Sequence, residues 1–151
     1  MLETVINDKD FAYQMQKNIQ DLIIHFFDKD QNFGILCKIE DISFNPELPD
    51  SINAEFRPLT LFFLAGYTFE TARIEGEYLV FEAGFGADNY GSLVTVPMLS
   101  IMQVIIDETP VLINLANYEK DRVVKKEVDG DGVENSMASF LSNPENSKFL
   151  K

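Results

Sequence analysis

The chain of 151 residues has no tryptophan, one cysteine and one histidine. The single cysteine, Cys37, excludes a disulfide within the chain and any zinc site built from several cysteines, and it fits a reducing compartment. The single histidine, His25, lies four residues after Asp21 and three before Asp28 on an expected helix, so a solvated charge pair explains it. A catalytic histidine needs a positioned partner, and neither a Ser-His-Asp nor a Cys-His arrangement is indicated.

Positive charge is also scarce. The chain has 12 basic and 25 acidic residues and a net charge of −13, of which −10 falls on residues 1–106 and −3 on the remainder. The acidic excess therefore belongs to the body of the protein. Such a surface repels phosphate backbones and anionic lipids and favours basic or neutral partners, so nucleic-acid and membrane binding are not expected.

Long hydrophobic runs are missing as well. The longest apolar-rich segment, residues 93–106, is interrupted by Thr95, Pro97 and Ser100 and is shorter than the roughly 20 residues of a membrane span. The first residues carry no basic cluster and reach Asp8 without an apolar segment of signal-peptide length. We expect a soluble cytoplasmic protein.

Two glycine-rich segments imitate known motifs and fail on detail. Residues 84–91 begin like a dinucleotide fingerprint, but Asn89 stands where the third glycine belongs and a strand is expected to follow. Residues 127–132 resemble a calcium loop, but the closing bidentate glutamate would fall on Ala138. The remaining carboxylates are scattered. We therefore expect no metal, no cofactor and no enzymatic activity.

The expected fold class is α+β, mainly β. An apolar stripe at helical spacing, widened by Ile23 and Phe27, predicts an N-terminal helix over about Asp8–Asp30. The same stripe predicts a homodimer, because it is wider than one contact needs. Its central residues, the expected dimer interface, are Phe11, Met15, Ile19, Leu22 and Phe26.

The rest of the chain predicts short strands and turns. Residues 45–51, with two prolines, indicate a loop, and Pro97 favours a short buried helix over Pro97–Ile106. Short Gly-containing connections predict an antiparallel meander of three strands. The expected strands are Gly34–Phe44, the meander Pro58–Ala65, Thr68–Ile74 and Tyr78–Phe85, then Ser92–Val96 and Pro110–Leu115.

The charged, glycine-containing residues 119–151 predict a flexible tail. The tail ends in Lys148, Phe149, Leu150 and Lys151, two apolar residues between two lysines. Such a terminus is either inert or a short docking peptide.

The order of these elements, with Phe-x-Ala-x-Phe-Gly at Phe81–Gly86 and Val-Pro-Met before the second predicted helix, resembles the stringent starvation protein B (SspB) family of adaptors for the ClpXP protease. The resemblance runs from about Met15 to Tyr118. It implies an SspB-like peptide-binding domain over 1–118, with a half-open Sm-like or SH3-like β-barrel, a short inserted helix and a homodimer formed through the N-terminal helix. The flexible tail, 119–151, then carries the docking peptide.

The resemblance also implies a binding site for peptide tags on ribosome-rescued proteins, the ssrA tags, and docking of Lys148–Lys151 on a ClpX-type AAA+ unfoldase. Where the family has an arginine and an asparagine, this chain has Gly84 and Glu82, so its groove is less basic. The groove residues implied by position are Ala65, Tyr67, Thr68, Phe69, Ala83, Gly84 and Phe85.

Two other functions remain open from the residues themselves. One is a small acidic chaperone that binds peptides or proteins and whose C-terminus is inert. The other is a small hydrolase that uses clustered carboxylates, which requires a deep pocket with convergent acids.

Overall fold

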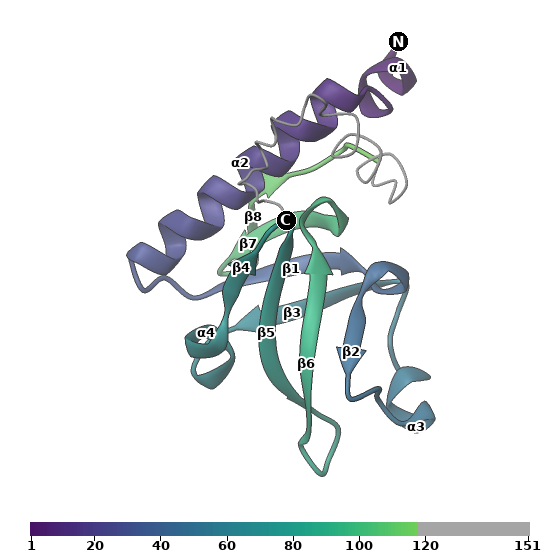
Figure 1. The fold of residues 1–151 in the computed structure, drawn as a ribbon, viewed down its shortest axis with the longest axis vertical. Helices are drawn as coiled ribbons and strands as arrows, with labels where there is room; N and C mark the ends of the chain where they lie inside the picture. The colour runs from purple at the N-terminus through teal and green to yellow at the C-terminus, as the bar shows by residue number, and fades with distance from the viewer. Residues whose placement is uncertain (118–151) are drawn as a thin grey trace. The chain divides into compact units, whose positions relative to one another are not determined.

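The longest helix in the described part of the chain is α2, Lys9–Asp28, which packs against the hydrophobic core (Figure 1). It begins where the Asp8 side chain accepts a hydrogen bond from the Phe11 backbone N–H at 2.9 Å and so caps the helix, and the predicted helix is confirmed. A short helix, α1, Leu2–Ile6, precedes it and was not predicted. The computed structural model describes residues 1–117, and the predicted tail 119–151 lies outside the described residues.

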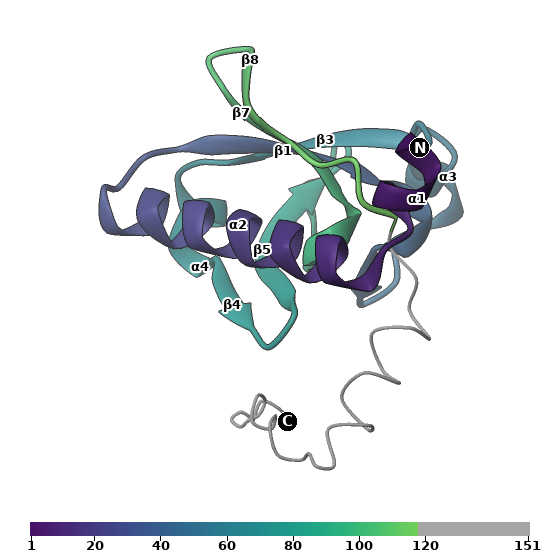
Figure 2. The same cartoon turned by 90° about the horizontal axis from the view of Figure 1, so that it is seen from above.

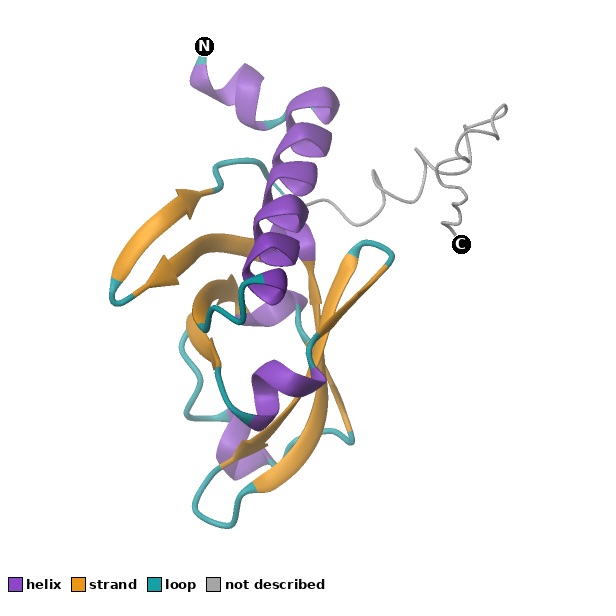
Figure 3. Cartoon of the chain, turned by 90° about the vertical axis from the view of Figure 1, so that its left-hand side faces the viewer, coloured by secondary structure: helices purple, strands orange, loops and turns teal. Residues whose placement is uncertain are grey.

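The strands form two antiparallel sheets of four strands each (Figures 1 and 3). The first sheet has the order β3-β1-β7-β8, made of β1 Phe33–Lys38, β3 Leu59–Leu64, β7 Ile101–Ile106 and β8 Thr109–Ile113. The second has the order β2-β6-β5-β4, made of β2 Ser43–Asn45, β4 Arg73–Glu75, β5 Tyr78–Phe85 and β6 Tyr90–Pro97. The α+β, mainly β class is confirmed. Residues 1–117 form no closed barrel.

Short helical turns connect these strands. They are the 3-10 turns η1 Ile39–Asp41 and η2 Met98–Ser100 and the helices α3 Asp50–Asn53 and α4 Tyr67–Thr71. The turn η1 divides the predicted strand Gly34–Phe44 into β1 and β2, which belong to different sheets. One apolar run therefore contributes to both sheets.

The predicted strand Thr68–Ile74 is wrong in its first half. Gly66 has a φ of +58°, which reverses the chain, and the Glu70 N–H donates to the Gly66 carbonyl at 2.9 Å to close the first turn of α4. Only Arg73–Glu75 is extended, as β4. The predicted meander is consequently split, because its first strand is β3 in one sheet and its last is β5 in the other.

The predicted helix Pro97–Ile106 is also wrong. Pro97 ends β6 opposite Tyr78, η2 makes a single turn, and β7 follows from Ile101 as an inner strand between β1 and β8. Inner strands produce nearly continuous apolar runs, which resemble a short buried helix in sequence. Pro97 favours the first turn of a helix, and for that reason a helix was predicted where the chain forms a strand.

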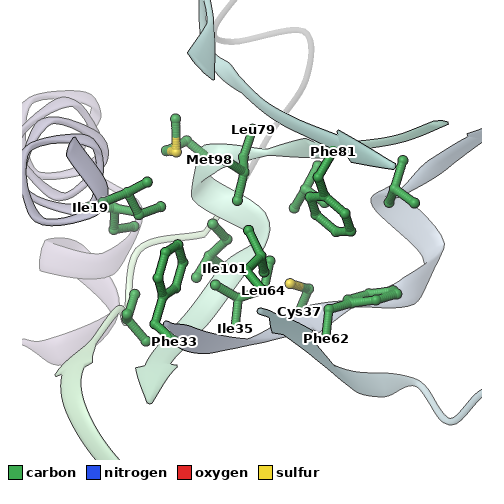
Figure 4. Packing of buried hydrophobic residues seen from close by; sticks show 14 residues of the cluster. Ile19, Phe33, Ile35, Cys37, Phe62, Leu64, Leu79, Phe81, Met98 and Ile101 are labelled. Carbon is green, nitrogen blue, oxygen red and sulfur yellow. The ribbon is translucent and has the colours of Figure 1, made fainter. Parts of the chain in front are cut away.

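The core lies between the inner faces of the two sheets, with α2 packed against one end (Figure 4). Ile19 and Ile23 of α2 are fully buried with Phe33, Leu79 and Met98. Cys37 lies in the same core, where burial raises the pKa of its thiol far above the ordinary value. The cysteine is therefore a packing residue, in agreement with its place in an apolar strand.

Candidate functional site

One edge of β5 has no neighbouring strand along its second half. β4 pairs with Tyr78, Val80 and the residue between them, and no other strand within residues 1–117 pairs with this side of β5. The other sheet ends in β3, which pairs only with β1. Between these two edges lies α4, which contacts both β3 and β5 (Figure 1). We call these two edges, Leu59–Leu64 of β3 and the second half of β5 up to Phe85, together with α4 between them, the β3–β5 mouth.

The backbone of β5 faces this mouth at alternate residues. The Glu82 N–H donates to Thr71 Oγ1 of α4 at 3.0 Å, so the backbone polar groups of Glu82 point away from β6. In an antiparallel strand the N–H and C=O of one residue share a side, and the sides alternate along the strand. Gly84 therefore presents its N–H and C=O to the same side, beyond the reach of β4. These are the groups that an added peptide strand needs.

A side-chain hydrogen bond connects α4 to β5 beside this edge. The Tyr67 hydroxyl donates to Glu82 Oε1 at 2.6 Å, and both side chains are accessible to solvent. The hydrogen bond to Glu82, and then the negative charge of that carboxylate, raise the pKa of the Tyr67 hydroxyl, because ionisation removes the donor and places two negative charges together. The pair keeps the Tyr67 ring next to the open edge.

We expect Tyr67 to ionise above the ordinary tyrosine value of about 10 and Glu82→Gln to bring its pKa back toward that value. The measurement is an NMR titration of tyrosine ring carbons, with Tyr67→Phe to assign the signal. Equal Tyr67 pKa values in the wild type and in Glu82→Gln would contradict the pairing.

The position of the Asn89 side chain also requires a glycine at residue 84. A side chain at this position would overlap the amide of Asn89, which stands across the β5–β6 turn. Asn89 itself has a φ of +53°, a left-handed conformation that asparagine tolerates better than most residues. The Asn89 amide therefore occupies the space that a side chain at residue 84 would need.

A cluster of aromatic rings lies at the end of β5 and joins the two sheets. Phe85 of β5 lies 6.3 Å from Phe62 of β3 between ring centroids, and Phe62 lies 5.8 Å from Phe81. Phe44 and Phe56 complete the cluster, at 5.6 Å and 6.0 Å from Phe85. Phe85, Phe44 and Phe56 remain partly exposed, so an apolar side chain of a bound peptide would meet aromatic surface here.

Phe69, the middle residue of α4, belongs to a second aromatic group. Its ring lies 5.8 Å from Phe27 of α2 and 6.3 Å from Phe33. Beside it is a shallow, open pocket of about 520 Å³, lined by Phe27, Asp30, Asn32, Gly66, Phe69, Glu70 and Ala72. Its apolar floor and two carboxylates match the stem and the charge of a lysine or arginine side chain.

The structure brings the seven groove residues near one another only in part. Tyr67 is tied to β5, and Ala83, Gly84 and Phe85 line the open half of that strand. Ala65 is exposed at the end of β3, whereas Thr68 and Phe69 are half-buried in α4 rather than in a strand. Thr71, Phe56 and Phe62 were missed. Their only sequence signal is the unusual number of phenylalanines, 13.

Comparison with known proteins adds no relative. The chain matches no family model, no curated protein and no solved structure. The chemistry of the β3–β5 mouth therefore has to follow from its own residues. Within residues 1–117 no group of three or more histidine, cysteine or acidic side chains is placed to hold a metal ion. No helix in the same part of the chain is long and apolar enough to cross a membrane.

Most of the residues expected to form a dimer interface on α2 pack against the core of the same chain. Ile19 is fully buried, and Leu22 and Phe26 pack against the core. Phe11 and Met15 are half-buried. Three of the five expected interface residues thus pack within the chain, while Phe11 and Met15 keep part of their surface exposed. The expected docking residues, Lys148, Phe149, Leu150 and Lys151, lie outside the described residues.

Proposed function

We propose that this chain is a non-catalytic adaptor that binds an extended peptide in the β3–β5 mouth and delivers the tagged protein to a ClpX-type AAA+ unfoldase of the ClpXP protease. The observation that carries the proposal is the open edge of β5 beyond Glu82, where the N–H and C=O of Gly84 have no neighbouring strand within residues 1–117. Peptides that add a strand to a sheet gain affinity from main-chain hydrogen bonds and specificity from alternate side-chain pockets.

The two-sheet architecture supports this function. We interpret the sheets as a half-open barrel of Sm-like type, in which α4 stands where further pairing between β3 and β5 would close the structure. Closure removes free edges and leaves no place for another strand. A barrel left open between β3 and β5 keeps an edge for a ligand while its core remains packed.

The charge around the β3–β5 mouth defines the preferred peptide. Glu82 stands on the edge strand, and Asp30 and Glu70 line the adjoining pocket. We therefore propose ssrA-type tags of neutral or basic character as cargo. Opposite charges across such a site raise the encounter rate and disfavour partners of the same sign.

The test is a fluorescence titration with three labelled peptides of one ssrA-type sequence, carrying neutral, basic and acidic substitutions. We expect the neutral and basic peptides to bind. The affinity for the basic peptide should fall by about threefold or more between about 0.05 M and about 0.5 M salt, because salt screens exposed charges. The neutral peptide is the matched control and should change less.

Absence of binding by all three peptides would contradict the proposed function. A clear preference for the acidic peptide would contradict the charge argument alone. Binding with no effect on degradation by the protease would favour the alternative of a small acidic peptide-binding chaperone.

A further inference from the structure

The outer face of the sheet β3-β1-β7-β8 is apolar and uncovered. Phe33, Ile35 and Cys37 of β1 point into the core, so Gly34, Leu36 and Lys38 point outward. The strand register places two rows of outward residues across the sheet. They are Leu61, Leu36, Gln103 and Ile113 in one row and Phe63, Gly34 and Ile105 in the other.

The side chains on this face are exposed to an unusual degree. Leu61 is 44% exposed, Phe63 62% and Ile113 57%, and Leu59 and Val111 add further apolar surface at 47% and 49%. Figure 2 shows α2 and β5 on one side of β1 and β3, with the β7–β8 hairpin projecting from the other side. Within residues 1–117 no element covers this outer face.

Charges stand at two diagonal corners of the face and leave its centre neutral. Lys38 ends β1 opposite Leu59, and Arg57 lies two residues before that leucine, so the corner at β3 is basic. Asp107 and Glu108 form the exposed turn between β7 and β8. Because β1 and β7 are antiparallel, this acidic turn lies at the end of the sheet remote from Lys38. The acidic turn also lies at the β8 edge of the sheet, opposite the β3 edge where Arg57 lies.

We propose that this outer face binds the same face of a second copy of the chain. A twofold axis that lies in the interface, perpendicular to the diagonal between the two corners, exchanges the corners. It therefore places Lys38 and Arg57 of one copy against Asp107 and Glu108 of the other, twice over. An interface of this kind is self-complementary, as twofold symmetry requires. The strands of the two copies then cross in the orthogonal class of sheet packing.

The charge of the body favours this face over any other for self-association. Residues 1–117 carry 18 acidic and 6 basic side chains, so two copies repel each other over most of their surfaces. The outer face is neutral at its centre and carries its own complement at its corners. A basic partner would gain more on the acidic surfaces elsewhere, so the occupant that this face fits is a second copy.

The face concentrates exposed apolar side chains, since Leu61, Phe63 and Ile113 are each about half exposed or more. Contiguous apolar patches on a protein surface commonly mark interaction sites. A standard interface buries about 800 Å² on each partner, with an apolar centre and a polar rim. Here the charged corners form the rim. The interface also leaves the β3–β5 mouth of each copy accessible, because the mouth opens at α4 and β5 on the other side of the sheet (Figure 2).

Sedimentation velocity on the full chain tests the proposal. We expect a dimer for the wild type, a monomer for Phe63→Glu and a dimer for Met15→Lys, the control on α2. Phe63 is mostly exposed, so the substitution leaves the core intact, which thermal unfolding checks. A monomeric wild type, or a Phe63→Glu variant that still forms dimers, would overturn the proposal.

An exchange of charges between the corners gives a second test that does not alter the apolar centre. The first variant is Lys38→Glu with Arg57→Glu, and the second is Asp107→Asn with Glu108→Lys, where asparagine keeps the left-handed turn. Each variant alone should dimerise at least about tenfold more weakly. An equimolar mixture should form heterodimers, since each corner then meets an opposite charge. A mixture no more associated than its components would overturn the proposed geometry.

Discussion

Replacing Gly84 by proline, in a chain that also carries Asn89→Gly, is expected to lower the affinity for a neutral tag peptide by about tenfold or more. The Gly84 N–H faces the β3–β5 mouth and not β6, so proline removes a donor to the peptide without breaking the β5–β6 ladder. The proline ring also occupies the edge on which the added strand would lie. Asn89→Gly is needed because any side chain at residue 84 overlaps the Asn89 amide.

The matched control is Gly84→Ala on the same Asn89→Gly background. Alanine adds a Cβ but keeps the N–H, so its affinity should stay within about threefold of the background. Both variants should unfold at similar temperatures, which circular dichroism checks. If the proline and alanine variants bind the peptide equally well, strand addition at β5 is excluded, even where the wild type binds the peptide tightly.

The part of the fold that could be predicted from the sequence is the part whose apolar residues repeat with an unambiguous helical period. The stripe that contains Ile19 repeats at helical spacing over about four turns, so α2 was predicted to within two residues at each end. The surface against which this apolar stripe packs was harder to predict. A wide stripe indicates a large buried surface, but the sequence does not distinguish a surface buried by the same chain from one buried by a second copy.

The failures lie where local sequence is ambiguous and tertiary pairing decides. Residues 101–106 are apolar except for Gln103, a pattern that fits either a buried strand or a helix, and only their position between β1 and β8 makes them β7. The segment after Gly66 alternates weakly, and the positive φ of that glycine starts a helical turn instead of a strand. Single residues with special backbone conformations redirected the chain in ways that average propensity does not show.

The candidate site shows the same division. Phe85 and Gly84 were assigned to the groove from their position in the resemblance, and both lie on the open half of β5. Phe56 and Phe62 are distant from them in sequence and join them only through the packing of two sheets. The contact of Thr71 with β5 could not be predicted, because it depends on α4 and this segment was predicted as a strand. The long-range partners of a site cannot be read from spacing within one segment.

Removal of the last four residues, Lys148–Lys151, is expected to abolish stimulated degradation of a tagged substrate by the protease. Phe149 and Leu150 are proposed to fill an apolar groove on the unfoldase, while the lysines set orientation and encounter rate. These four residues lie outside the described residues, and none of them is among the residues assigned to the β3–β5 mouth. Thermal stability and peptide affinity should therefore be nearly unchanged.

A pair of matched substitutions separates docking from a general effect of the tail. Exchange of Phe149 and Leu150 for serine should abolish stimulated degradation as truncation does, because the adaptor then no longer links cargo to the unfoldase and the gain in effective concentration is lost. Exchange of Phe140 and Leu141 for serine removes the same kinds of side chain and should have a smaller effect. Rates of degradation of a fluorescent tagged substrate measure both. If the truncated chain accelerates degradation as well as the full chain, the tethering mechanism is wrong and the protein acts as a peptide-binding chaperone.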